Sequence, residues 1–282
     1  MPSPTGLPSA LQDLDRTIIF GILNVTPDSF SDGGKFASTQ QAIAQGVHLA
    51  ATGADIIDIG GESTRPGASR VAAQEELDRV IPVVEGLVAH GVTVSVDTMR
   101  AQVAREAAKA GAKIINDVSG GKSDPEMFAT MAELAIPFIL MHWRGPSNAM
   151  DTLTTYQNVV EEVASELSKR VDKAIEVGIK REHIVLDPGL GFAKTPEQNW
   201  PLIKQIETLQ DLGFPLLVGA SRKKFLGELL SNANGPREVC AREAATTALT
   251  TVLAQRKIWA VRVHNTQDAF DAVTVVQRLQ SS

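Results

Sequence analysis

The sequence has few cysteines, few aromatic side chains, and no long basic or apolar run. Its 282 residues include one cysteine, Cys240, which excludes an intrachain disulfide or a cage of thiolate metal ligands, and we interpret this residue as structural. A formal net charge of −6 without a basic stretch argues against binding to nucleic acid or a membrane surface, because both need a positive face. Neither a membrane-spanning run nor a signal-peptide pattern is present. A reducing, cytoplasmic setting is therefore expected.

What the sequence does contain is an alternation of eight short runs rich in valine and isoleucine with segments of helical period. The runs are "TIIFGILN", "ADIIDIGG", "TVSVDT", "KIINDVS", "PFILMHW", "IVLDPG", "LLVGAS" and "AVRVHN". Between them, apolar residues recur every three or four positions, as at Leu77, Val80 and Val84. Eight such pairs predict an α/β protein with one (β/α)8 TIM barrel over residues 16–282, after a flexible tail at 1–15. A doubly wound open sheet is the alternative fold.

Local signals also predict where some helices begin and end. Ser38 with Gln41, and Thr195 with Gln198, have the spacing of a capping box at a helix start. Helix ends are predicted at five glycines, namely Gly53, Gly91, Gly111, Gly178 and Gly213.

A polar residue stands at or just past the end of every predicted strand. These residues are Asn24, Glu62, Asp97, Asn116, His142, Asp187, Ser221 and His264. In a barrel these strand ends share one rim, where active sites lie. Any one of them could instead cap a helix or a turn, but eight at one rim favour a common pocket.

The predicted strand ends include two carboxylates in apolar surroundings. Asp97 and Asp187 follow apolar residues, so each should be partly desolvated at the barrel mouth, at a cost of several kcal/mol per ion unless donors meet it. With the amide of Asn116 they favour a ligand edge rich in N–H donors, such as a flat heterocycle with an amino-pyrimidine edge. A carboxylate pair for glycoside hydrolysis is the alternative, but only 5% of the residues are aromatic and could stack on a sugar.

Cationic side chains form a second group, in the second, seventh and eighth units of the barrel. Arg65, Lys223, Arg262 and His264 lie on loops or strand ends, and the last two units of such barrels commonly hold phosphate. A local positive cluster on an acidic protein suggests an anionic substrate group. Lys223 could alternatively be a Schiff-base nucleophile. Zinc motifs are absent from the sequence, whereas Mg²⁺ shared with a diphosphate requires only one amide oxygen, such as that of Asn24.

Beyond its tail, the chain resembles the dihydropteroate synthase family over essentially its whole length. The motifs that carry the resemblance, in family order, are "GILNVTPDSFSDGG", "DIGGESTRPGA", "VDTMR", "NDVSGG", "LMHW", "LDPGLGFAKT", "GASRKKFLG" and "VRVH". The resemblance implies condensation of 6-hydroxymethyl-7,8-dihydropterin diphosphate with 4-aminobenzoate, giving 7,8-dihydropteroate and diphosphate, with Mg²⁺ as cofactor. It also implies a homodimer and competition by sulfonamides.

The resemblance further implies which residues bind each substrate and which take part in catalysis. The pterin would be bound by Asp97, Asn116, Asp187 and Lys223, in a slot shaped by Met141, Phe192, Gly219 and Arg262. The 4-aminobenzoate would be framed by Phe30, Thr64, Arg65, Pro66, Phe192, Ser221 and Lys223. The diphosphate would meet Arg65, Arg262, His264 and, through Mg²⁺, Asn24. The catalytic residues would be Asp32, Lys223 and Arg65, with Asp32 and Phe30 arriving on a loop that closes over the site.

Two other readings stay open at this point. A pterin-dependent methyltransferase that serves a corrinoid protein would share the pterin acceptors, although "NVTPDSFSDGG" together with "SRKK" is not expected in such a domain. A non-catalytic pterin-binding paralogue is the second alternative, which the intact loop residues disfavour.

Overall fold

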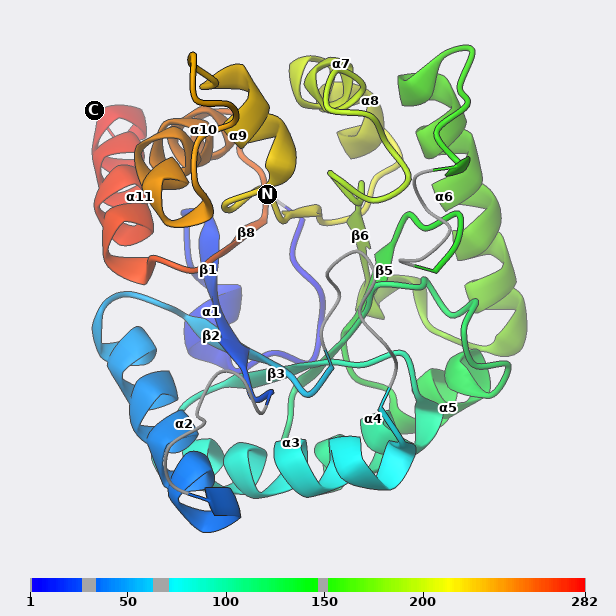
Figure 1. Ribbon diagram of the computed structural model, residues 1–282. Helices are drawn as coiled ribbons and strands as arrows, with labels where there is room; N and C mark the ends of the chain where they lie inside the picture. Colours follow the sequence, from blue (N-terminus) through cyan, green and yellow to red (C-terminus); the bar gives the residue numbers. More distant parts are fainter. Residues whose placement is uncertain (1, 27–33, 63–70, 147–151, 282) are drawn as a thin grey trace.

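Eight parallel strands form a closed ring in the computed structural model, which describes residues 2–26, 34–62, 71–146 and 152–281 (Figure 1). The strands are β1 (Ile18–Asn24), β2 (Ile56–Gly60), β3 (Val94–Asp97), β4 (Ile114–Asp117), β5 (Phe138–Met141), β6 (Ile184–Asp187), β7 (Leu217–Val218) and β8 (Ala260–Val263). Their hydrogen-bonded order is β6-β5-β4-β3-β2-β1-β8-β7. A parallel bridge between Leu186 and Leu216 joins the two ends of this order. The predicted barrel is therefore confirmed, and the open sheet is wrong.

Helices surround the ring on its outside (Figure 1). The α-helices are α1 (Ser9–Gln12), α2 (Gly34–Ala51), α3 (Ala73–Ala89), α4 (Ala101–Lys109), α5 (Met127–Leu134), α6 (Val159–Val177), α7 (Asn199–Lys204), α8 (Glu207–Gln210), α9 (Lys224–Leu229), α10 (Glu243–Gln255) and α11 (Thr266–Gln280). The described part of the chain also contains the 3₁₀ helices η3 (Arg181–His183), before β6, and η4 (Val239–Arg242), before α10. Over the described part of the chain, no helix has the length and apolar character to cross a membrane. Cys240 is exposed in η4, so it does not contribute to the core as its structural interpretation implied.

The core has two layers because strand side chains alternate in direction. Outward residues such as Ile57 and Ile59 pack with Val80 and Val84 of α3. The inner layer fills the ring with Ile18, Phe20, Ile56, Ile114, Ile139, Val185, Leu217, Trp259 and Ala260. Two residues further along five of the strands, the next inward positions are Asp58, Asn116, Met141, Asp187 and Arg262. A period of two therefore places polar groups directly above an apolar floor.

The amino-terminal segment packs against the apolar floor on the side opposite the polar groups. Leu7 is 6% exposed and packs into the inner layer, and Leu11 and Leu14 pack beside it. The backbone N–H of Thr5 donates to the carbonyl of Glu182 at 2.9 Å. The flexible tail at 1–15 stays a prediction, while three spaced leucines of this segment pack against the apolar ring opening.

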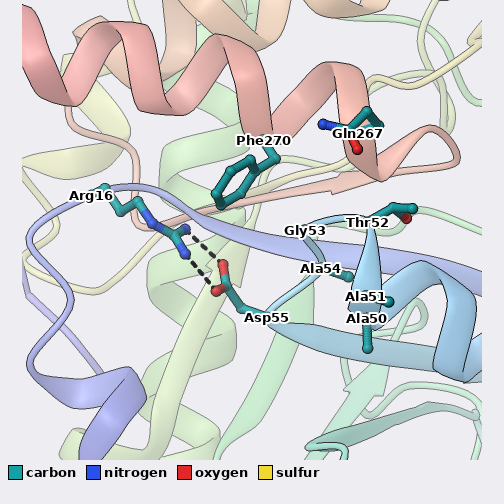
Figure 2. Close-up of a pocket in the computed structure, with 9 residues that line it drawn as sticks. All are labelled: Arg16, Ala50, Ala51, Thr52, Gly53, Ala54, Asp55, Gln267 and Phe270. Atoms are coloured by element: carbon teal, nitrogen blue, oxygen red, sulfur yellow. Dashed lines mark hydrogen bonds and ion pairs between the residues drawn. The ribbon is translucent and has the colours of Figure 1, made fainter.

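A hollow of about 350 Å³ lies near the amino-terminal ends of β1 and β2 (Figure 2). The guanidinium of Arg16 forms two hydrogen bonds with the carboxylate of Asp55, at 2.7 and 2.8 Å, and lies over the ring of Phe270. None of the predicted site residues lines this hollow. The site must therefore be sought at the carboxyl-terminal rim.

Candidate active site

The carboxyl-terminal rim brings together predicted pterin residues from five strands. Asp97, Met141 and Asp187 are the last residues of β3, β5 and β6, and Asn116 and Arg262 are the last but one of β4 and β8. The Asp97, Asn116 and Asp187 side chains are at most 9% exposed. The prediction that both carboxylates are desolvated in the barrel mouth is confirmed.

Asp58 links these residues from beneath, and sequence reasoning missed it. It is fully buried on β2, and its Oδ2 accepts hydrogen bonds from Arg262 Nε at 2.5 Å and from Asn116 Nδ2 at 3.1 Å. Arg262 also donates to Asp97 Oδ2 at 3.1 Å. Arg262 thus projects into the barrel mouth, as predicted, and joins two carboxylates. The sequence signal that could have identified Asp58 was its place at an inward-facing position of the strand in "ADIIDIGG".

The ionised forms of the two rim carboxylates, Asp97 and Asp187, are less stable in this site than they would be in water. Burial raises the pKa of Asp97 to about 7, against the opposing effect of Arg262. Burial likewise raises the pKa of Asp187 to about 6, although the backbone N–H of Gly189 donates to its Oδ1 at 2.7 Å. A ligand that brings N–H donors to these carboxylates would favour their ionised forms. Such a site is suited to a donor-rich heterocycle.

Lys223, Phe192 and Gly219 lie around Asp187. The Lys223 ammonium lies 4.1 Å from the centroid of the Phe192 ring, a cation–π contact. Burial lowers the pKa of Lys223 to about 8, and Asp187 acts in the opposite direction. A Cβ at Gly219 would lie 3.9 Å from both Asp187 Oδ2 and Arg262 Cβ. Gly219 therefore leaves space between two charged residues, as a slot requires.

Asn24, Ser221 and His264 lie at the ends of β1, β7 and β8. Asn24 is exposed, and its Oδ1 would be 3.5 Å from a Cβ at Gly60. Ser221 Oγ and His264 Nδ1 are 3.0 Å apart. In the described ranges, no group of three or more His, Cys, Asp or Glu side chains could hold a metal ion. An exposed amide oxygen such as that of Asn24 does suit an Mg²⁺ ion that takes its other ligands from diphosphate and water.

Several predicted site residues cannot be placed. Phe30, Asp32, Thr64, Arg65 and Pro66 lie outside the described residues, so their roles stay predictions. Glu62 is described, but its carboxylate pairs with Arg100 at 3.2 Å and accepts from the Val71 N–H at 3.0 Å. These contacts join this strand-end residue to Val71, before α3, and to Arg100.

A second polar cluster lies behind Asp187, and of its members sequence reasoning identified His142 but missed Lys194. Lys194 is 7% exposed, and its Nζ lies 3.0 Å from His142 Nδ1. His142 Nε2 contacts Glu166 at 3.0 Å, and Arg144 binds the same carboxylate. Burial lowers the pKa of Lys194 to about 7 and, together with Lys194, that of His142 to about 4. His142 is therefore neutral at pH 7 and bonded within the rim.

Comparison with known proteins identifies the class to which this barrel and slot belong. Residues 20–264 match the family of pterin binding enzymes. A dihydropteroate synthase of Mycobacterium leprae is 47% identical over 260 residues, 92% of each chain. The structure of Xanthomonas albilineans dihydropteroate synthase with 4-aminobenzoic acid has a TM-score of 0.87 and 43% identity, covering 95% of this chain and 94% of that one.

A third comparison concerns an inhibitor complex. The Yersinia pestis dihydropteroate synthase with a sulfonamide drug has a TM-score of 0.89 and 37% identity, covering 99% of both chains. The chain belongs to the dihydropteroate synthase family of pterin binding enzymes, which are transferases of folate synthesis.

Proposed function

We propose that this chain condenses 6-hydroxymethyl-7,8-dihydropterin diphosphate with 4-aminobenzoate, giving 7,8-dihydropteroate and diphosphate. The observation that carries the proposal is the rim cluster of Asp97, Asn116, Asp187 and Arg262 over an apolar floor. A pterin presents the amino and ring N–H donors that two under-stabilised carboxylates require. The family and the 4-aminobenzoic acid complex of the Xanthomonas relative support the same assignment.

Each residue of the slot has a part in holding the pterin. Asp97 and Asp187 accept from its N–H groups, while Lys223 and Arg262 donate to its acceptors. The Asn116 amide donates to Asp58, which leaves its carbonyl oxygen directed away from Asp58 and free to accept from the ligand. Met141 and Phe192 provide apolar surface for the flat ring, and Gly219 leaves it room.

The reaction then requires a good leaving group and a positioned amine. The bond between the pterin methylene carbon and the diphosphate oxygen breaks, and its electron pair leaves with the diphosphate. Arg262, His264 and Arg65 stabilise the leaving charge. Asn24 would hold Mg²⁺, which lowers the charge on the diphosphate when it is bound.

The cation that remains is delocalised into the pterin ring, so no covalent enzyme intermediate is needed. The 4-aminobenzoate nitrogen attacks the methylene carbon, and the proton that it loses passes to the released diphosphate or to water. Phe30, Thr64, Pro66, Ser221 and Phe192 frame the incoming ring, and Asp32 lies near the cation. Positioning of this kind contributes up to about 7 to 11 kcal/mol in ideal cases. Lys223 serves here as a donor, because the substrates offer no aldehyde or ketone for a Schiff base.

Inhibition and assembly follow from the same assignment. Sulfonamides mimic 4-aminobenzoate and would compete at Thr64, Arg65, Ser221 and Lys223. A homodimer is supported by exposed apolar side chains on outer elements away from the slot, namely Leu229, Val239, Val252, Val275 and Leu279. Light scattering would test the dimer through the mass in solution. We also propose a cytoplasmic location, supported by the single unpaired cysteine.

One assay tests the function. Pure protein with Mg²⁺ and the pterin diphosphate should release diphosphate only when 4-aminobenzoate is present. Asp97→Asn and Asp187→Asn should each lower kcat/KM at least about tenfold, because each removes a charged acceptor of the pterin. No release by the wild-type protein would favour a non-catalytic paralogue. Methyl transfer to a corrinoid would favour the pterin-dependent methyltransferase.

A further inference from the structure

Lys194 carries a nearly buried amine behind Asp187 and has no part in the reaction described above. It follows the loop 188–193, which leads away from Asp187 at the end of β6. We propose that Lys194 is a positioning residue that fixes this loop, and through it the Asp187 carboxylate and the Phe192 ring that hold the pterin. The inference rests on the proposed function.

The first step of the argument is the convergence of the loop on the Lys194 amine. Lys194 Nζ donates to the carbonyls of Gly189 at 3.0 Å and of Phe192 at 3.1 Å. The loop that Lys194 holds contains three left-handed residues, with φ of +63° at Gly189, +76° at Gly191 and +47° at Ala193. The left-handed conformation is unfavourable for a residue such as alanine, because its Cβ crowds the following carbonyl oxygen. The two hydrogen bonds from Lys194 offset such a cost.

The second step connects the loop to the pterin residues. The N–H of Gly189 donates to Asp187 Oδ1 at 2.7 Å, so the residue whose carbonyl Lys194 holds also orients the carboxylate. A Cβ on Gly189 would lie 2.4 Å from the carbonyl oxygen of His142, which shows how closely the loop lies against the end of β5. The Phe192 carbonyl is held by Lys194 while its ring faces Lys223. The positions of two substrate-facing groups, the Asp187 carboxylate and the Phe192 ring, thus depend on the Lys194 amine.

The third step is the support behind Lys194. His142 Nδ1 lies 3.0 Å from the amine, and His142 Nε2 lies 3.0 Å from Glu166 on α6. Arg144 donates to the same carboxylate and stacks 3.7 Å from the Tyr156 ring, whose hydroxyl donates to the Ala193 carbonyl at 3.0 Å. These contacts fix Lys194 to the end of β5 and to α6, and Lys194 in turn holds the loop in place. Supporting contacts of this kind orient the groups that touch a ligand.

A double-mutant cycle tests the inference through the affinity for 6-hydroxymethylpterin, measured by calorimetry. Lys194→Met keeps the length and burial of the side chain and removes its donors, and we expect it to raise Kd about tenfold. Because Lys194 acts through Asp187, adding Lys194→Met to Asp187→Asn should raise Kd less than threefold further. The matched control cycle uses Asp97→Asn, on the other side of the slot, where the full tenfold effect should remain.

The outcomes are distinct. Equal effects of Lys194→Met in the Asp187→Asn and Asp97→Asn backgrounds would overturn the positioning role, as would an unchanged Kd in the single variant. Thermal unfolding identifies a Lys194→Met variant that does not fold, and Lys194→Gln, which keeps an uncharged N–H donor group, then carries the same cycle. A wild-type protein that binds no pterin would overturn the proposed function and the inference together, which separates that failure from the first two.

Discussion

Single buried carboxylates should make pterin affinity depend on pH. Burial raises the pKa of Asp97 to about 7 and that of Asp187 to about 6, whereas a pterin donates to their ionised forms. Both groups lose protons as pH rises from 5.5 to 7.5, so affinity should rise at least about tenfold over this range. Calorimetry with 6-hydroxymethylpterin at several pH values measures the trend. Asp97→Asn should remove the part near pH 7, and an affinity that falls with rising pH would contradict the assignment.

Gly219 offers a test of the slot that leaves its charges intact. A Cβ there would have no neighbour closer than 3.9 Å, and Gly219 does not have a left-handed φ, so Gly219→Ala should fold with an unchanged Tm. The added methyl would occupy space between Asp187 and Arg262. We expect Kd for the pterin to rise about tenfold, as crowding in a packed site costs about 1 to 3 kcal/mol. Unchanged affinity would place the pterin elsewhere.

Among single residues, the sequence predicted those whose neighbours along the chain indicate their place in the fold. Asp97 and Asp187 stand at the ends of apolar runs, and Arg262 interrupts one, so local pattern alone predicted that all three lie at the barrel mouth. Asp58 and Lys194 were missed because their partners are brought to them only by folding. Asp58 and Arg262 are 204 positions apart, and the carbonyls around Lys194 converge only after the loop has coiled.

At the scale of elements, the sequence predicted helix ends better than helix starts. All five predicted terminal glycines have positive φ, a conformation that glycine adopts readily. The capping box at Ser38 is wrong, because α2 already begins at Gly34. At Thr195 the backbone N–H donates to Oε1 of its predicted partner, Gln198, at 2.8 Å, but α7 begins only at Asn199. A Ser-x-x-Gln spacing also occurs inside helices, whereas a left-handed residue ends them.

The cap of α6 supports a prediction about stability. Asn158 Oδ1 accepts from the N–H groups of Val160 at 3.2 Å and Glu161 at 3.4 Å. Asn158→Ala should lower the free energy of unfolding by about 1 kcal/mol, because these donors lose their partner. Urea denaturation measures the loss. Asn234→Ala, at an exposed loop position, is the matched control and should change little. Equal stability of both variants would contradict the cap.

For the whole molecule, the barrel was predictable because each strand and helix pair carries its own periodicity. Closure followed from the number of pairs, and the rim site followed from the polar residue at each strand end. The packing of the amino-terminal segment against the apolar floor was not predictable in the same way. Leu7, Leu11 and Leu14 stand in a segment with prolines and no strand pattern, and their burial depends on a ring opening formed by distant strands.

The amino-terminal segment should therefore stabilise the barrel without taking part in the chemistry. Leu7 is 6% exposed and packs with Ile18, Phe20 and the rest of the inner layer, so Leu7→Ala should lower the free energy of unfolding by about 2 to 3 kcal/mol. KM for both substrates should stay within twofold, because the slot lies at the other end of the ring. Val177→Ala, at a valine that is 49% exposed, is the control and should change neither quantity. If Leu7→Ala were as stable as this control, the segment would be the flexible tail that the sequence predicted. If it raised KM at full stability, the floor and the slot would be coupled through the inner layer.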